Sequence, residues 1–77
     1  MKVIIVSPEK TLFNGEAQGV LVPGEFGAFE ILKGHAPIIS TLSAGNIKVI
    51  SEELLHISIS GGFVEVANDE VSICVEI

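Results

Sequence analysis

The chain has 77 residues, 48% of them hydrophobic, and its ten acidic residues against four lysines give a formal net charge of −6. This length holds one domain, residues 1–77, with a thin core. Phosphate neutralisation needs clustered Lys and Arg, so the charge argues against nucleic acid and an anionic lipid surface as partners and favours a basic protein surface. The single cysteine, Cys74, excludes an internal disulfide. The longest purely apolar run, 3–6, is too short to enter a membrane.

In the first third of the chain, the pattern of apolar and turn-forming residues predicts short strands separated by turns. Segments 2–6 and 19–22 are apolar on both sides, which indicates strands covered on both faces, by this chain or by a partner. Ser7-Pro8-Glu9-Lys10 carries a weak helix signal, with Ser7 as N-cap and Pro8 at the first position, and is predicted to be a turn. Asn14-Gly15 is a further predicted turn.

The rest of the chain alternates between apolar and polar residues with a period of two. The clearest case runs from Val71 to Ile77, and 47–49 and 55–59 follow the same pattern. Turn signals separate these segments at Pro23-Gly24, Lys33-Gly34, Ala44-Gly45, Gly61-Gly62 and Asn68-Asp69. This spacing leaves no room for helices of ordinary length, so the sequence predicts an all-β, two-layer antiparallel β-sandwich.

Residues that could carry catalysis or hold a metal do not occur in a recognisable pattern. His35 and His56 stand alone, without Cys, His or Asp at metal-ligand spacing. No serine has a nucleophile-elbow context, which argues against a small hydrolase. Gly24-x-x-Gly27 lacks the lysine and the following helix of a phosphate-binding loop. We therefore expect no enzyme activity, no cofactor, no metal and no nucleotide.

Six motifs, in this order, resemble the N-terminal β-sandwich of the epsilon subunit of F-type ATP synthase over nearly the whole chain. They are Val3 to Glu9, Phe13-Asn14-Gly15, Val22 to Gly27 followed by Gly34-His35-Ala36-Pro37, Leu42 to Val49, Ile59 to Val66, and Val71 to Glu76. Each motif alone is ordinary turn or strand chemistry, whereas the ordered set is specific.

The resemblance implies a fold of about ten short strands in two five-stranded sheets. It also implies a non-catalytic rotor subunit in the central stalk of a proton-translocating synthase, coupling rotation of the c ring to the gamma subunit and the catalytic head. The expected place is peripheral, on the cytoplasmic face of a bacterial plasma membrane, through the complex. The residues implied to contact the c ring and gamma are Gly27, Ala28, Phe29, Glu30, Gly34, His35, Ala36 and Pro37, and Ser7 is implied to contact gamma.

Two features depart from the family's pattern. Glu30 stands where the family usually has Gly, and Lys33 where it usually has Pro. A different loop path and a weak local ion pair between the two residues are therefore expected. The helical hairpin that commonly follows this domain in the family, and restrains ATP hydrolysis, has no counterpart in these 77 residues, so no such inhibition is expected.

The alternative interpretation is a lipoyl- or biotinyl-type carrier domain. Such domains are also small, acidic and all-β, and Lys33 would be the modified lysine at an exposed hairpin tip. The context Glu30 to Gly34 lacks the Met or acidic neighbour usual beside such a lysine. Intact mass after expression separates the two interpretations, because a carrier would gain the mass of the attached group.

Overall fold

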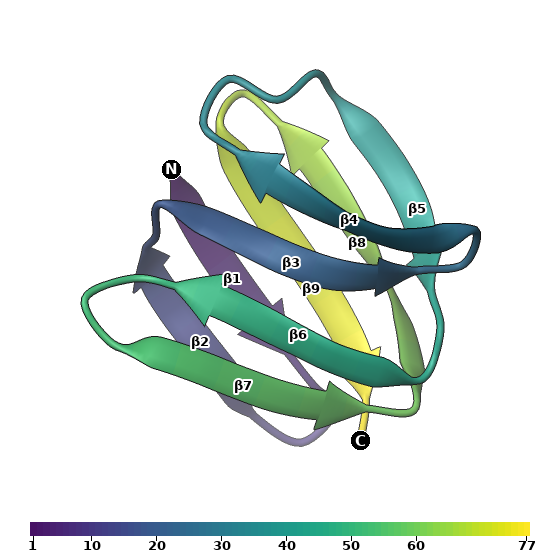
Figure 1. Ribbon diagram of the computed structural model, residues 1–77. Coiled ribbons are helices and arrows are strands. Elements are labelled where there is room, and N and C mark those ends of the chain that lie inside the picture. Colours follow the sequence, from purple (N-terminus) through teal and green to yellow (C-terminus); the bar gives the residue numbers. More distant parts are fainter.

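The computed structural model describes residues 1–77, which form nine strands and no helix (Figure 1). The strands are β1 (Lys2–Val6), β2 (Thr11–Glu16), β3 (Gly19–Gly24), β4 (Gly27–Leu32), β5 (Ile38–Leu42), β6 (Gly45–Ile50), β7 (Leu54–Ile59), β8 (Gly61–Ala67) and β9 (Glu70–Glu76). The predicted all-β class is confirmed. The structure contains no helix that is long and apolar enough to span a membrane.

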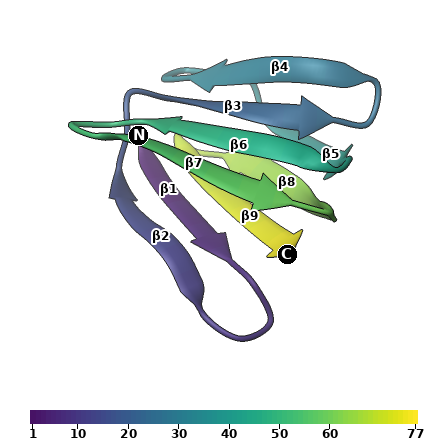
Figure 2. The same cartoon turned by 60° about the horizontal axis from the view of Figure 1, so that its bottom comes forward.

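The strands lie in two layers that face each other across one core (Figure 2). One layer has the order β2-β1-β9-β8-β5, and the other has β4-β3-β6-β7. The layers join at one place, where Gly24 of β3 pairs with Leu42 of β5. The sandwich thus has nine strands, where the resemblance implied about ten, and it is formally a single curled sheet.

One strand pair departs from the predicted antiparallel arrangement. β1 enters the sheet between β2 and β9 and runs parallel to β9, with Ile5 opposite Ile73. Lys2 N–H donates to the carbonyl oxygen of Asp69 at 3.2 Å, where this pairing starts. Period-two alternation indicates which face of the sheet a residue occupies, but not whether the neighbouring strand runs parallel or antiparallel. The alternation in the sequence therefore could not predict this pairing.

The core is built from the inward sides of both layers, as the alternation predicted. Val71, Ile73 and Val75 are buried, whereas Ser72 is exposed and Cys74 is half-buried. The core contains no buried polar or charged residue. Its side chains are Val3, Ile5, Ala17, Val20, Val22, Ile31, Leu42, Ile47, Val49, Ile59, Val64, Val66, Val71, Ile73 and Val75.

The two segments that are apolar on both sides are only partly covered by this chain. Val3 and Ile5 are fully buried, but Ile4 and Val6 on the outer face of β1 are half-buried. In β3, Leu21 is half-buried between the buried Val20 and Val22. The outer cover predicted for these strands is therefore incomplete within the chain.

Several predicted turns are confirmed. Ser7 N–H donates to the Lys10 carbonyl at 2.8 Å, and Lys10 N–H donates to Ser7 Oγ at 3.3 Å, which closes the β1–β2 turn. Asn68 and Asp69 form the β8–β9 turn with φ angles of 53° and 61°.

The glycine signals at Asn14-Gly15 and Gly61-Gly62 were wrongly interpreted as turns. Asn14-Gly15 lies inside β2, with Asn14 opposite Ile4. Gly61-Gly62 opens β8, and a Cβ on Gly62 would lie 2.3 Å from the carbonyl oxygen of Cys74. The glycine at position 62 therefore marks a close approach between strands, a second reason for glycine in sheets.

Candidate partner-binding site

The predicted contact residues follow β4 and the loop that leaves it. Gly27 and Ala28 open the strand directly after the β3–β4 turn, and the loop 33–37, exposed except at the half-buried His35, follows its last residue. Five steps along a strand at about 3.3 Å per residue separate the two ends by about 17 Å. The predicted set therefore divides between opposite ends of β4 (Figure 1).

The Gly34–Pro37 loop is shaped by glycine and by short hydrogen bonds. Gly34 adopts a φ of +84°, which favours glycine. His35 N–H donates to the Leu32 carbonyl at 3.1 Å, and His35 Nδ1 lies 2.7 Å from the Ala36 carbonyl oxygen. Because a carbonyl only accepts, this contact needs the proton on Nδ1. The ring is half-buried, while the loop residues around it are exposed.

The start of β4 presents an aromatic side chain that the sequence analysis did not include among the contact residues. Phe26, in the β3–β4 turn, is 97% exposed, which is unusual for so large an apolar group. Phe29, which was predicted to be a contact, is half-buried and packs against the core. An aromatic residue inside the turn Gly24 to Gly27 was the available signal for Phe26.

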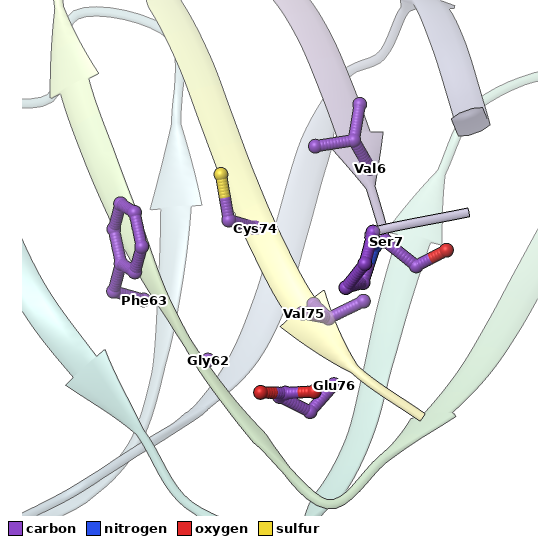
Figure 3. Close-up of a pocket in the computed structure, with 8 residues that line it drawn as sticks. Val6, Ser7, Gly62, Phe63, Cys74, Val75 and Glu76 are labelled. Atoms are coloured by element: carbon purple, nitrogen blue, oxygen red, sulfur yellow. The ribbon is translucent and has the colours of Figure 1, made fainter. Parts of the chain in front are cut away.

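Ser7 lies beside an apolar groove of about 360 Å³ on the outer face of the β1–β9–β8 layer (Figure 3). Its hydroxyl is already engaged in the β1–β2 turn. Phe63, half-exposed on β8, and Val6 on β1 stand on either side of Cys74. The signal for Phe63 was its position on the polar side of a strand whose inward residues are Val64 and Val66.

The strand register shows which of these features share an end of the sandwich. Val6 is opposite Cys74, and Cys74 is opposite Phe63, which in turn is opposite Thr41. Glu25 N–H donates to the Thr41 carbonyl at 2.9 Å. Ser7 and the β3–β4 turn therefore lie at one end, separated by the width of the sheet, and the Gly34–Pro37 loop lies at the other end beside the β8–β9 turn.

The predicted ion pair between Glu30 and Lys33 does not form. The only ion pair joins the N-terminal ammonium of Met1 to Glu16 at 3.3 Å. Glu30 lies within the strand, with its side chain near Gly19, and Lys33 is already in the turn. Residues three apart face each other on a helix and not on a strand, which explains the error.

The arrangement of side chains and strands supports neither metal binding nor a carrier function. No three His, Cys, Asp or Glu side chains are grouped so that they could hold a metal ion. Lys33 is exposed, but β4 pairs only with β3, so Lys33 is not at the tip of a hairpin as the carrier interpretation requires.

Known proteins are similar to this chain over all or nearly all of its length. The family described as the β-sandwich domain of the ATP synthase Delta/Epsilon chain matches residues 1–77. The ATP synthase epsilon chain of Leptospira borgpetersenii serovar Hardjo-bovis (strain JB197) is 45% identical over 74 residues, which are 95% of this chain and 58% of that protein. The epsilon chain of Trichodesmium erythraeum (strain IMS101) is 41% identical over 76 residues, 97% of this chain and 56% of that protein. The chain thus spans under two thirds of the length of these relatives.

Solved structures support the fold. One chain from the Tetrahymena thermophila mitochondrial ATP synthase central stalk and c ring superimposes with a TM-score of 0.88 at 18% identity, covering 100% of this chain and 63% of that one. A chain from the Euglena gracilis mitochondrial ATP synthase gives 0.87 at 22% identity, covering 95% and 48%.

Proposed function

Because the chain belongs to the family of ATP synthase delta/epsilon β-sandwich domains, we propose that it is a non-catalytic central-stalk subunit of a proton-translocating F-type ATP synthase. It turns with the c ring and the gamma subunit and transmits their rotation to the catalytic head. The observation that carries this proposal is the family match over residues 1–77, together with epsilon-chain relatives at 41% and 45% identity. The proposed place is the cytoplasmic face of a bacterial plasma membrane, through the complex, and the bacterial origin of these relatives supports it.

The surfaces proposed for the c ring and gamma are those that the fold leaves exposed. The Gly34–Pro37 loop projects from one end, and Gly27 and Ala28 lie exposed at the other. Ser7 is the proposed gamma contact, and the groove beside it would be filled by an apolar side chain from that partner. The formal charge of −6 favours basic surfaces on these partners.

A rotor domain needs stiffness, and the sandwich supplies it. Its two layers share one core without a buried polar group, and most strands are paired on both sides. Protein interiors packed in this way resist compression and transmit strain. Torque applied at one end of the sandwich is therefore passed to the other end with little deformation.

The test uses the two histidines as a matched pair. His35 lies in the proposed contact loop, whereas His56 is exposed on β7, outside every proposed contact surface. In the reconstituted synthase, His35→Ala is expected to lower ATP-driven proton pumping per ATP hydrolysed, and His56→Ala to leave it unchanged. Equal pumping efficiency in the two variants would remove the loop from the proposed site.

A further inference from the structure

The β8–β9 turn carries an unusual residue at its second position. Asn68 and Asp69 have φ angles of 53° and 61°, so both lie in the left-handed region. Two-residue hairpin turns of this kind prefer Asn-Gly, because glycine reaches positive φ without a steric cost. Asp tolerates this conformation less well than glycine does, so turn geometry alone does not explain Asp69.

The side chain of Asp69 connects this turn to a distant loop. Asp69 Oδ1 accepts a hydrogen bond from Gly34 N–H at 3.3 Å. The backbone carbonyl of the same residue accepts from Lys2 N–H at 3.2 Å. Asp69 therefore joins the β8–β9 turn to the start of β1 and to the β4–β5 loop. Glycine at this position would keep the bond to β1, which uses the backbone carbonyl, but could not make the bond to the loop, which uses the side chain.

The loop has no other hydrogen bond to another part of the fold. Its remaining bonds are local, from His35 N–H to the Leu32 carbonyl and from His35 Nδ1 to the Ala36 carbonyl. β4 and β5 do not pair with each other, so no backbone hydrogen bonds between these two strands fix the base of the loop. Pro37 has no N–H to donate. Between its ends, which continue into β4 and β5, the loop is therefore hydrogen-bonded to the rest of the sandwich through Asp69 alone.

We propose that Asp69 is a positioning residue that holds the Gly34–Pro37 loop, and with it His35, in the conformation that meets the stalk. The inference rests on the proposed function, because it assumes that this loop contacts the c ring or gamma. A loop fixed before binding loses less conformational entropy when it docks, so losing the tie weakens binding without removing a contact.

The test compares three variants of the 77-residue chain. Asp69→Gly removes the acceptor and retains a favourable Asn-Gly turn, so the hairpin itself is not weakened. Asp69→Asn keeps the Oδ1 acceptor and a residue that tolerates positive φ, and is the conservative rescue. Asn68→Gly relaxes the neighbouring turn position without touching the tie, and is the matched control.

Amide hydrogen exchange reports the tie itself. Asp69→Gly is expected to speed exchange of the Gly34 amide several-fold to about tenfold, as loss of one hydrogen bond predicts. Asp69→Asn and Asn68→Gly should leave that amide near its original rate. The Asp69→Asn result also separates loss of the hydrogen bond from loss of negative charge beside the amide. An unchanged Gly34 rate in Asp69→Gly would overturn the proposal.

Affinity for a purified complex of gamma with the c ring reports the consequence. Asp69→Gly is expected to weaken binding about threefold to tenfold, and Asp69→Asn to restore it. Asp69→Gly could speed exchange of the Gly34 amide and leave affinity unchanged, while His35→Ala weakens binding. In that case Asp69 is not a positioning residue, and the Gly34–Pro37 loop remains the proposed contact site. If His35→Ala also binds normally, the loop is not the interface, and both proposals about the loop are overturned.

Discussion

Adjacent glycines at the start of β8 have opposite steric surroundings. A Cβ on Gly62 would meet the Cys74 carbonyl oxygen at 2.3 Å, and backbone cannot move aside cheaply. A Cβ on Gly61 would find its nearest neighbour, the Leu42 carbonyl oxygen, at an ordinary 3.7 Å. One glycine is thus required by its strand neighbour, and the other is not.

The pair gives a stability prediction. Gly62→Ala should lower the free energy of unfolding by about 3 kcal/mol, because β8 and β9 must separate locally to admit the methyl group. Gly61→Ala should change it by less than about 0.5 kcal/mol. Urea denaturation followed by circular dichroism measures both, and similar midpoints for the two variants would show that the strands are not so closely packed.

Phe26 and Phe29 lie three residues apart and have opposite roles in this account. Phe26 is 97% exposed, so Phe26→Ala should leave stability within about 0.5 kcal/mol and weaken binding to the gamma–c-ring complex about tenfold. Phe29→Ala should instead lower stability by about 3 kcal/mol, because its ring packs against the core. Denaturation and binding measured on the same two proteins test the contrast, and unchanged binding by Phe26→Ala would exclude the β3–β4 turn from the interface.

At the level of the strands, β9 occupies the most protected place. It is paired with β1 on one side and β8 on the other, and it carries three core side chains. β7 lies at the edge of its layer and pairs only with β6. Cooperative opening should therefore start at the edge and reach β9 last.

Amide hydrogen exchange of the free chain tests this order. The median protection factor of the β9 amides should exceed that of the β7 amides by at least about tenfold, because β9 opens only when the whole sandwich unfolds. Comparable protection in the two strands would mean that the edge strand is covered, or that the sandwich opens as one unit.

The strands show how far the sequence predicted the fold. Alternation identified the inward residues of β9 and the exposed Ser72, because burial on one face imposes the pattern directly. It did not reveal that β1 runs parallel to β9, since pairing direction depends on contacts between the two ends of the chain. It misassigned Gly62, because glycine in a turn and glycine at a close approach have the same local signature.

At the scale of the molecule, the predicted contact residues proved to lie at two ends of the sandwich. The Gly34–Pro37 motif predicted a loop, and this loop is largely exposed in the structure, as expected for a segment of glycine, proline and short side chains. Its link to Asp69 spans 35 positions in sequence, and no local pattern encodes such a contact. An aromatic residue inside the Gly24 to Gly27 turn was a signal for Phe26, but that it is 97% exposed is a property of the fold that the turn motif does not give.

The acidic surface and the stiff sandwich fit a part that works only within an assembly. Under the proposed function the 77 residues carry no chemistry of their own, and their effect appears only when the stalk turns. We expect calorimetry to detect no ATP binding by the free chain, because the Gly24 to Gly27 turn has neither the lysine nor the helix N-terminus of a phosphate-binding loop. Micromolar affinity for ATP would contradict this.

The most direct measurement is restoration of ATP synthesis. The 77-residue chain would be added to membrane vesicles carrying the synthase of the same organism after removal of its own epsilon subunit, and synthesis driven by an imposed proton gradient would be measured. We predict that the chain restores synthesis, and that His35→Ala restores less than His56→Ala does. Synthesis that stays at the level of the depleted vesicles, with no binding of the chain to the stalk, would contradict the central claim.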